Sequence, residues 1–222
     1  MKRIAIVGNG PRKLIPDLRQ YASFTDTWIG ADRGALTVIE NGISPAFAVG
    51  DFDSINEREK EVVRSNADSF TTYPSEKDQT DLEIALDKAI SMDPQEIYLF
   101  GVTGGRLDHA MTNIQLLYLL LKKNVKGIII DTQNRMELTE PGSHEVSRSE
   151  TFPYISFVPL SKNVEGLTLQ GFYYPLNDQS IMWGSTLCIS NKLISNYGTF
   201  SYREGILLLI KSRDAVSHTI PV

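Results

Sequence analysis

The sequence contains a single cysteine, Cys188, so no disulfide can form within the chain. No histidine lies close to it in the sequence to activate its thiol, and we interpret Cys188 as a small buried side chain. An excess of positive charge is also lacking, because 22 basic side chains stand against 27 acidic ones. Nucleic-acid binding depends on lysine and arginine that neutralise phosphates, and the net charge of −5 therefore argues against a nucleic-acid partner.

Long apolar runs are absent as well. After residues 1–3 only four apolar residues precede Gly8, too few for a signal peptide, and no later segment is long enough for a membrane helix. These absences predict a cytoplasmic protein with no membrane partner. The chain shows no internal repeat or low-complexity segment, and its 222 residues suffice for one large domain or two modest ones.

Up to about residue 133, short apolar runs alternate with polar turns and helical stretches. The expected strands are residues 4–7, 27–30, 47–49, 70–73, 97–100 and 128–130. This alternation predicts βαβ units. We expect residues 1–133 to form a three-layer α/β/α domain with a mostly parallel, Rossmann-like six-stranded sheet.

Two helices are well marked in this first domain. Thr80 and Glu83 form a capping-box pattern before a run of apolar residues at helical spacing. A longer apolar stripe begins at Leu107, and we expect it to face the core. Its members are Leu107, Ala110, Met111, Ile114, Leu117, Tyr118 and Leu121.

Helical periodicity ends near residue 132 and β-rich runs follow. They cover residues 136–138, 144–146, 154–158, 167–169, 186–189, 199–202 and 206–210. Turn residues such as Pro141 and Gly142 separate several of them. The pattern predicts an all-β second domain, a sandwich or small barrel, over residues 134–212. Residues 213–222 form a tail for which the sequence indicates no partner.

Residues 50–54 (Gly-Asp-Phe-Asp-Ser) directly follow the third expected strand. Asp51 and Asp53 then lie at the carboxyl end of that strand, where open α/β sheets bind ligands. Two carboxylates so close repel each other unless a cation lies between them, and a divalent ion with oxygen ligands is the usual solution. The alternative is a solvated turn, because glycine, aspartate and serine are ordinary turn residues.

Other carboxylates follow neighbouring strands. Asp32 follows the second expected strand, Asp78 and Asp81 follow the fourth, and Asp108 follows the fifth. In a parallel sheet they share one edge with Asp51 and Asp53, and this recurrence favours a common cation-rich site over chance placement.

The segment 77–81 (Lys-Asp-Gln-Thr-Asp) contains two of these carboxylates at the start of a helix. There, Asp78 and Asp81 are favoured by the helix dipole alone, and a plain helix cap is the alternative interpretation. Lys77, Gln79 and Thr80 add a cation, an amide and a hydroxyl, which together can position a phosphate and a metal-bound water.

A glycine-rich stretch, residues 101–109, joins the fifth strand to the long helix. Backbone amides beside Gly104 and Gly105 can approach a phosphate, although the stretch has neither the P-loop ending nor the dinucleotide spacing. Arg106 adds a forked donor for phosphate oxygens. Asn113 shares a helix face with His109, for which a direct role and a packing role both remain open.

Three motifs, residues 50–54, 77–81 and 103–109, resemble in their order and spacing the thiamine pyrophosphokinase family. The resemblance extends to residues 184–191 of the second domain. It implies transfer of the terminal pyrophosphoryl group of ATP to the hydroxyethyl oxygen of thiamine, giving thiamine diphosphate and AMP. It also implies an α/β catalytic domain, a β-rich thiamine-binding domain and a homodimer whose active sites lie between subunits.

The resemblance also suggests roles for the residues of the first domain. Mg²⁺ clamping the triphosphate would be held by Asp51, Asp53 and Asp78. Positioning and charge stabilisation should do most of the work of the transfer. Lys77 and Arg106 would offset the remaining negative charge, Asp108 would orient Arg106 or a water, and Asp81 is a candidate base for the thiamine hydroxyl. The other expected substrate-binding residues of this domain are Asp32, Gln79, Thr80, Gly104, Gly105, His109 and Asn113.

Thiamine is a cationic aromatic molecule, and aromatic walls with a few hydrogen-bonding groups suit it. By the resemblance, Ser190 and Asn191 contact its pyrimidine ring. Tyr174 stands where related sequences can carry tryptophan, which makes Tyr174 a candidate for stacking. Trp183 is a second candidate, although core packing is the interpretation we favour for it.

Two other functions fit part of this pattern. In a phosphohydrolase, Asp51 would be the nucleophile, but that motif is expected after the first strand rather than the third. A nucleotide or thiamine sensor would bind the same ligands without turnover, but it has little need for so many carboxylates.

Overall fold

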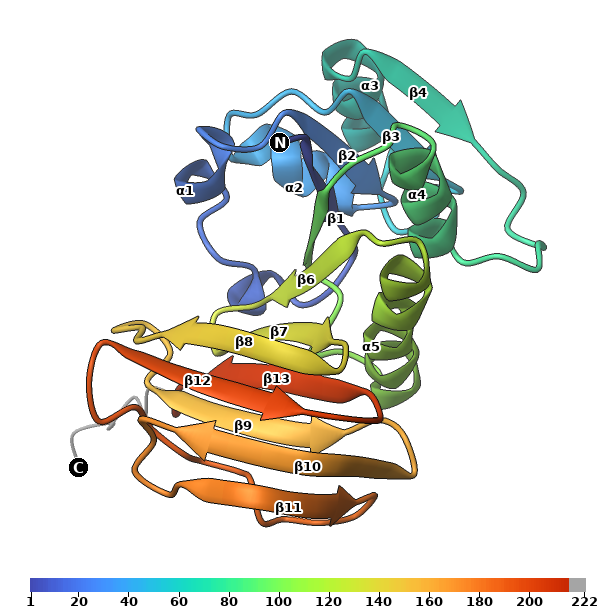
Figure 1. The fold of residues 1–222 in the computed structure, drawn as a ribbon. Coiled ribbons are helices and arrows are strands. Elements are labelled where there is room, and N and C mark those ends of the chain that lie inside the picture. The colour runs from blue at the N-terminus through green and yellow to red at the C-terminus, as the bar shows by residue number, and fades with distance from the viewer. Residues whose placement is uncertain (216–222) are drawn as a thin grey trace, which may run out of the picture. The chain divides into compact units, whose positions relative to one another are not determined.

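The computed structural model describes residues 1–215 and separates the chain into two compact units, Met1–Thr132 and a second unit from Gln133 onward. The first unit alternates strands with helices, whereas the described part of the second is built from strands (Figure 1). None of the described helices is both long and apolar enough to cross a membrane.

Six parallel strands form the sheet of the first unit. They are β1 (Arg3–Val7), β2 (Thr27–Ala31), β3 (Phe47–Gly50), β4 (Ser69–Thr72), β5 (Glu96–Phe100) and β6 (Lys126–Ile130), in the order β4-β3-β2-β1-β5-β6. The predicted parallel arrangement of these six strands is confirmed, although the sheet that contains them has nine strands in all. The strand order reverses at β1, which pairs with both β2 and β5, and the carboxyl ends of strands at such a reversal form a natural ligand crevice.

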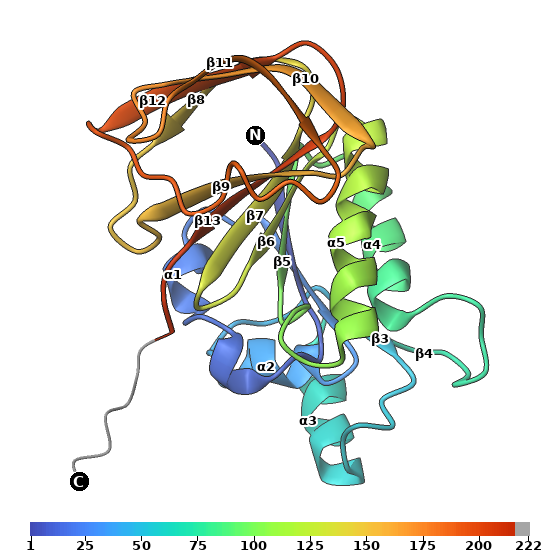
Figure 2. The same ribbon diagram turned by 90° about the horizontal axis from the view of Figure 1, so that it is seen from below.

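The helices of the first unit lie on both faces of this sheet. They are a 3-10 turn η1 (Arg12–Leu14), α1 (Arg19–Ala22), α2 (Gly34–Glu40), α3 (Glu57–Asn66), α4 (Asp81–Ile90) and α5 (Leu107–Lys122). Figure 2 shows α4 and α5 on one side of the sheet and α1 and α2 on the other. Because both faces are covered, consecutive residues of β1 are buried whichever way they point, and Ile4, Ala5, Ile6 and Val7 have no exposed surface.

Both α3 and α4 begin with complete capping boxes. The Asn56 side chain accepts from the Glu59 backbone amide in α3, and the Thr80 side chain accepts from the Glu83 amide in α4. In the reciprocal bonds, the Glu59 and Glu83 carboxylates accept from the backbone amides of Asn56 and Thr80. The predicted helix start at Thr80 is confirmed, and the apolar face of α4 is buried as expected at Leu82, Ala85, Leu86 and Ala89.

The prediction of a buried stripe along α5 was wrong for most of its length. Leu107, Met111 and Tyr118 are exposed, and the buried residues of α5 are Leu116, Leu117 and Leu120. Gly127 of β6 explains why this face of α5 is the buried one, because a Cβ at residue 127 would lie 2.6 Å from the Leu120 side chain and 2.8 Å from that of Leu117. The absence of a side chain at residue 127 lets this face of the helix approach the sheet.

The described part of the second unit consists of antiparallel strands in two layers. Its strands are β7 (Asn134–Thr139), β8 (Gly142–Ser147), β9 (Tyr154–Pro159), β10 (Asn163–Gln170), β11 (Leu176–Met182), β12 (Tyr197–Tyr202) and β13 (Leu207–Ser212). In one layer β7, β13 and β9 are the last three strands of the nine-stranded sheet, and the other layer is a four-stranded sheet with the order β11-β10-β12-β8. Side chains from both, including Phe157, Leu167 and Phe200, share one buried core, as in a sandwich.

Two details of the second unit differ from the prediction. Residues 186–189 form turns rather than a strand, and the strand of this region is β11, whose sequence Leu-Asn-Asp-Gln-Ser-Ile-Met is mostly exposed and lacks apolar alternation. Cys188 is buried as expected, and burial raises the pKa of its thiol to about 11. At the start of the expected tail, the Arg213 amide donates to the Gln133 carbonyl and Tyr154 donates to Asp214, so these residues do have partners; residues 216–222 lie outside the described part of the chain.

Candidate active site

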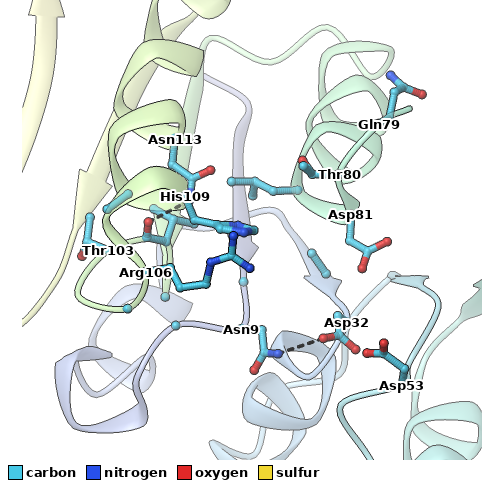
Figure 3. Close-up of a pocket in the computed structure, with 18 of the residues that line it drawn as sticks. Asn9, Asp32, Asp53, Gln79, Thr80, Asp81, Thr103, Arg106, His109 and Asn113 are labelled. Carbon is cyan, nitrogen blue, oxygen red and sulfur yellow. Dashed lines mark hydrogen bonds between the residues drawn. The ribbon is translucent and has the colours of Figure 1, made fainter. Parts of the chain in front are cut away.

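The carboxyl ends of the parallel strands in the first unit surround a cavity of about 710 Å³. This volume is within the range of small-molecule sites. Its wall combines the loop after β1, the ends of β2 and β3, the segment 75–82 and the segment 101–113 (Figure 3). The cavity therefore lies at the point of strand reversal, where the topology favours a ligand site.

Most of the residues predicted for the first domain lie in this wall. They are Asp32, Asp53, Lys77, Asp78, Gln79, Thr80, Asp81, Gly105, Arg106, His109 and Asn113. Asp51, Gly104 and Asp108 lie beside the wall and act through neighbours described below. Tyr174, Ser190 and Asn191 belong to the second unit.

Asp32, Asp51 and Asp53 form the tightest acidic cluster, with one carboxylate oxygen of each within 4.8 Å of the others. Asp32 is 7% exposed, and its Oδ1 is buried without a hydrogen-bond partner in the described structure. Its Oδ2 accepts a hydrogen bond of 2.9 Å from the Asn9 amide. A buried carboxylate oxygen without a donor, facing two further carboxylates, is suited to a hard divalent cation. Asp78 lines the cavity but is not part of this cluster.

The spacing of these carboxylates is fixed by the backbone around them. Phe52 is fully buried, has a φ of +55°, and stacks on Phe70 of β4 with ring centroids 4.6 Å apart. It anchors the turn, so Asp51 and Asp53 flank a residue that belongs to the core. Gly50 lets β3 come close to β2, because a Cβ there would lie 3.0 Å from the Asp32 backbone nitrogen.

The electrostatics of the cluster disfavour three bare negative charges. Burial raises the pKa of Asp32, and the charges of Asp81 and Asp51 raise it further, against the lowering effect of neighbouring hydrogen-bond donors. A cation within the cluster would favour the ionised form of Asp32.

Lys77 provides one positive charge here. Its Nζ lies 3.0 Å from Asp81 Oδ1 and 4.0 Å from Asp51 Oδ2, and all three side chains are at most one-fifth exposed. Nζ also donates to the Pro74 carbonyl at 3.0 Å. Asp81 Oδ1 makes no hydrogen bond of good geometry despite this short distance, so the contact is mainly Coulombic.

The opposite side of the cavity is cationic. In Figure 3, Arg106 and His109 project from the start of α5 toward the carboxylates of the β2 and β3 ends. Arg106 donates two hydrogen bonds to Asp108, at 3.2 and 2.5 Å, and these hold the pKa of Asp108 at about 2. Asp108 therefore stays ionised and orients the Arg106 guanidinium at the cavity.

The glycine-rich loop after β5 is held by side chains outside it. Asn113 donates to the Val102 carbonyl at 2.8 Å, and Thr103 donates to the buried Asp131 carboxylate at 2.7 Å. Gly104 has a φ of +78°, and a Cβ there would lie 1.9 Å from the Leu14 side chain, so only glycine fits. Asn113 and Gly104 thus shape the wall.

Sequence reasoning missed Asn9. The segment 8–10 (Gly-Asn-Gly) follows the first expected strand and has no predicted role, yet it lines the cavity, and its Asn9 orients Asp32. The available signal was its position, because a polar side chain after β1 shares the edge that carries the carboxylates. Gly10 brings the loop against β5, with its backbone amide donating to the Gly101 carbonyl at 2.7 Å.

In the second unit, Asn191 is 2% exposed and its side chain binds backbone groups. Its Oδ1 accepts from the Tyr174 amide at 3.0 Å and its Nδ2 donates to the Tyr174 carbonyl at 2.8 Å. Asn191 therefore fixes the Tyr174 backbone, whereas Ser190 and Tyr174 are themselves exposed. Trp183 is 65% exposed, so its expected place in the core was wrong.

Comparison with known proteins shows which family shares this arrangement. Residues 18–129 match the family described as "Thiamin pyrophosphokinase, catalytic domain", and residues 143–207 match "Thiamin pyrophosphokinase, vitamin B1 binding domain". A curated thiamine pyrophosphokinase of Bacillus subtilis is 50% identical over 214 residues, covering 96% of this chain and 100% of the relative.

Solved structures give the same result. The crystal structure of thiamine pyrophosphokinase from Bacillus subtilis has a TM-score of 0.92 at 49% identity, covering 96% of this chain and 100% of that chain. The thiamin pyrophosphokinase structure from Geobacillus thermodenitrificans has a TM-score of 0.86 at 45% identity, covering 96% and 99%. The likeness thus includes both units.

Proposed function

This chain belongs to the thiamin pyrophosphokinase family, and we propose that the cavity of its first unit is where the family's reaction takes place. The activity is that of a thiamine pyrophosphokinase: the terminal pyrophosphoryl group of ATP passes to the hydroxyethyl oxygen of thiamine, giving thiamine diphosphate and AMP. The observation that carries the site proposal is the cluster of Asp32, Asp51 and Asp53 facing Arg106 across the cavity.

We propose that Mg²⁺ binds at this cluster, held by Asp32, Asp51 and Asp53. The unpartnered Asp32 Oδ1 supports this, and it puts Asp32 among the ligands beside the two residues of the 50–54 motif. Asp78, which lies in the cavity wall just before α4, can bind the ion through a water or contact the nucleotide. When bound, the ion neutralises phosphate charge and polarises the phosphorus that is attacked.

Different residues of the chain would then have different roles in the pyrophosphoryl transfer. The thiamine hydroxyl oxygen bonds to the β-phosphorus of ATP, the bond from that phosphorus to the bridging oxygen of the α-phosphate breaks, and AMP leaves with that oxygen. Asp81, in the cavity wall, would accept the hydroxyl proton. Arg106, aimed by Asp108, would stabilise charge on the phosphate oxygens.

The other residues predicted for the first unit line the same cavity. Gln79 and Thr80 stand at the start of α4, and Gly105 and His109 stand at the start of α5, where backbone amides favour an anion. We propose residues 1–133 as the ATP- and magnesium-binding domain and residues 134–212 as the thiamine-binding domain. A cytoplasmic location, where ATP is available, fits this assignment.

We further propose a homodimer in which thiamine binds between subunits. Exposed aromatic side chains of the second unit, Tyr174 and Trp183, suit a cationic ring system, with Ser190 nearby as a hydrogen-bonding group. The exposed apolar residues Leu107 and Met111 of α5 support an interface, because a stripe of this kind on a helix is the sort of surface that a second copy covers.

The test of the function is a product analysis. Purified protein is incubated with ATP, magnesium and thiamine, and nucleotides and thiamine species are separated. AMP and thiamine diphosphate in equal amounts are expected. ADP with thiamine monophosphate would mean a stepwise kinase, whereas free phosphate would indicate a hydrolase and absence of turnover a sensor.

Replacing Asn9 with alanine is expected to weaken metal binding by about tenfold. The variant removes the Asn9 amide that donates to Asp32 Oδ2, and partners that orient a metal ligand typically contribute a factor of 10 to 100 to affinity. Titration with Mn²⁺ measures the change. Asn66→Ala, at the exposed end of α3, is the control, and equal affinities for the two variants would contradict a role for Asn9.

A further inference from the structure

Lys77 and the proposed metal ion share one carboxylate, that of Asp51. Asp51 belongs to the acidic cluster and also lies 4.0 Å from the Lys77 ammonium. We propose that Lys77 is an internal competing cation that makes metal binding depend on nucleotide: it holds Asp51 and Asp81 against free metal and turns to the triphosphate when metal and nucleotide arrive together. This inference rests on the proposed function and assigns Lys77 a positioning role within that site.

The contacts of Lys77 hold its ammonium beside the acidic cluster. Its side chain is 16% exposed, and its ammonium is held by the Pro74 carbonyl at 3.0 Å and by Asp81 at 3.0 Å. Lys77 stands four residues before Asp81, directly ahead of the capping box that starts α4, so the helix start fixes the position of this ion pair. The positive charge is therefore built into the edge of the metal site.

The electrostatic consequence follows from the sign of each charge. A divalent ion bound through Asp51 would lie within a few ångströms of the ammonium, and the side chains of Asp51 and Lys77 are both largely shielded from water. Repulsion at such distances is strong when little solvent separates the charges. Metal alone is therefore disfavoured, whereas metal with a triphosphate has net negative charge and attracts the same ammonium.

A purely structural ion pair would behave differently. If Lys77 only fastened the start of α4, its removal would lower stability without altering how metal and nucleotide affect each other. The distinguishing quantity is the coupling factor, the ratio of metal dissociation constants without and with nucleotide. Linkage requires the same factor for nucleotide binding without and with metal, which provides an internal check.

The experiment measures Mn²⁺ binding by electron paramagnetic resonance, with and without the α,β-methylene analogue of ATP, in which the bond to be cleaved is blocked. For Lys77→Gln we expect Mn²⁺ alone to bind about tenfold more tightly than to the wild type, and the coupling factor to fall by about tenfold or more, within the usual range for coupled sites. Lys77→Arg, which keeps the charge, should retain most of the coupling.

Lys88→Gln is the matched control, because Lys88 lies on α4, the helix that Lys77 precedes, and its ammonium lies over the Phe47 ring at 4.2 Å rather than at the cluster. It should bind Mn²⁺ like the wild type. Circular dichroism confirms folding of each variant, and Lys77→Met replaces Lys77→Gln if the latter does not fold.

The outcomes distinguish failure of the role proposed for Lys77 from failure of the proposed metal site. An unchanged coupling factor in Lys77→Gln, or Mn²⁺ alone binding no more tightly, would overturn the role of Lys77. The proposed metal site would instead be overturned if the wild type failed to bind Mn²⁺ in the presence of the analogue, or if Asp51→Asn bound Mn²⁺ as tightly as the wild type.

Discussion

Replacing Asp51 or Asp53 with asparagine should reduce thiamine diphosphate formation by about a thousandfold or more while the protein stays folded. An amide keeps the shape of the side chain but removes one negative charge from the cluster that is proposed to hold the metal ion. Single groups that stabilise transition-state charge commonly contribute a factor of 100 to 1,000, and loss of the ion removes more than one such interaction. The fold should survive because the core residue of this turn is Phe52, which both variants retain.

The rate of AMP release with thiamine present measures activity, and thermal unfolding measures the fold. Asp68→Asn is the matched control, because Asp68 is exposed just before β4, at the amino end of that strand rather than at the carboxyl edge. Activity of Asp51→Asn within tenfold of the wild type, with the same magnesium requirement, would refute the assignment of this residue. Unfolding of both variants would show instead that the carboxylates stabilise the turn.

Asp32→Asn is expected to act in opposite directions on activity and stability. Activity should fall by at least about a hundredfold, since the variant loses the most buried carboxylate of the cluster. In the presence of a metal chelator, the free energy of unfolding at neutral pH should rise by about 1 kcal/mol, because the amide removes a charge that is buried and repelled by its neighbours. Asparagine also tolerates the φ of +52° found at this position.

The pH dependence gives this prediction its sign. The folded protein raises the pKa of Asp32 above the ordinary value of 3.8, so the folded state binds this proton more tightly than the unfolded chain does. The cost of the ionised carboxylate is therefore present above the raised pKa and disappears below 3.8. Denaturant unfolding of both proteins with chelator should show a gap that closes as the pH falls through this window. A gap that widens toward acid would show that Asp32 stabilises the fold in its charged form.

Five strands of the first unit could be predicted from the sequence because each is a short, largely buried apolar run ended by a polar turn, whereas β4 is half-exposed. Since every strand is parallel, the position of each carboxylate after its strand also placed it at one edge, and this brought Asp32, Asp51, Asp53 and Asp81 into one region before any coordinates existed. The distances within that region depend on backbone detail that the pattern does not contain. Asp32 and Phe52 both have left-handed φ values, and Asp32 rather than Asp78 is the third member of the cluster.

Other features could not be predicted, for physical reasons that differ. The sequence of α5 is apolar on more than one face, so periodicity alone did not identify the buried one; the contact with Gly127 did. The strand β11 is exposed and polar along most of its length, and its pairing with β10, rather than its own side chains, makes it a strand. The contact of Lys77 with two carboxylates depends on a turn before α4, which composition does not reveal.

The buried Phe52 has a further consequence for the energetics of ligand binding. Because the residue between Asp51 and Asp53 packs on Phe70, the order needed at the cluster is acquired when the chain folds. An arriving ligand then does not have to freeze this turn, and the conformational entropy that binding would otherwise lose has already been lost in forming the core. Affinity at this site thus depends on an aromatic contact that no ligand touches.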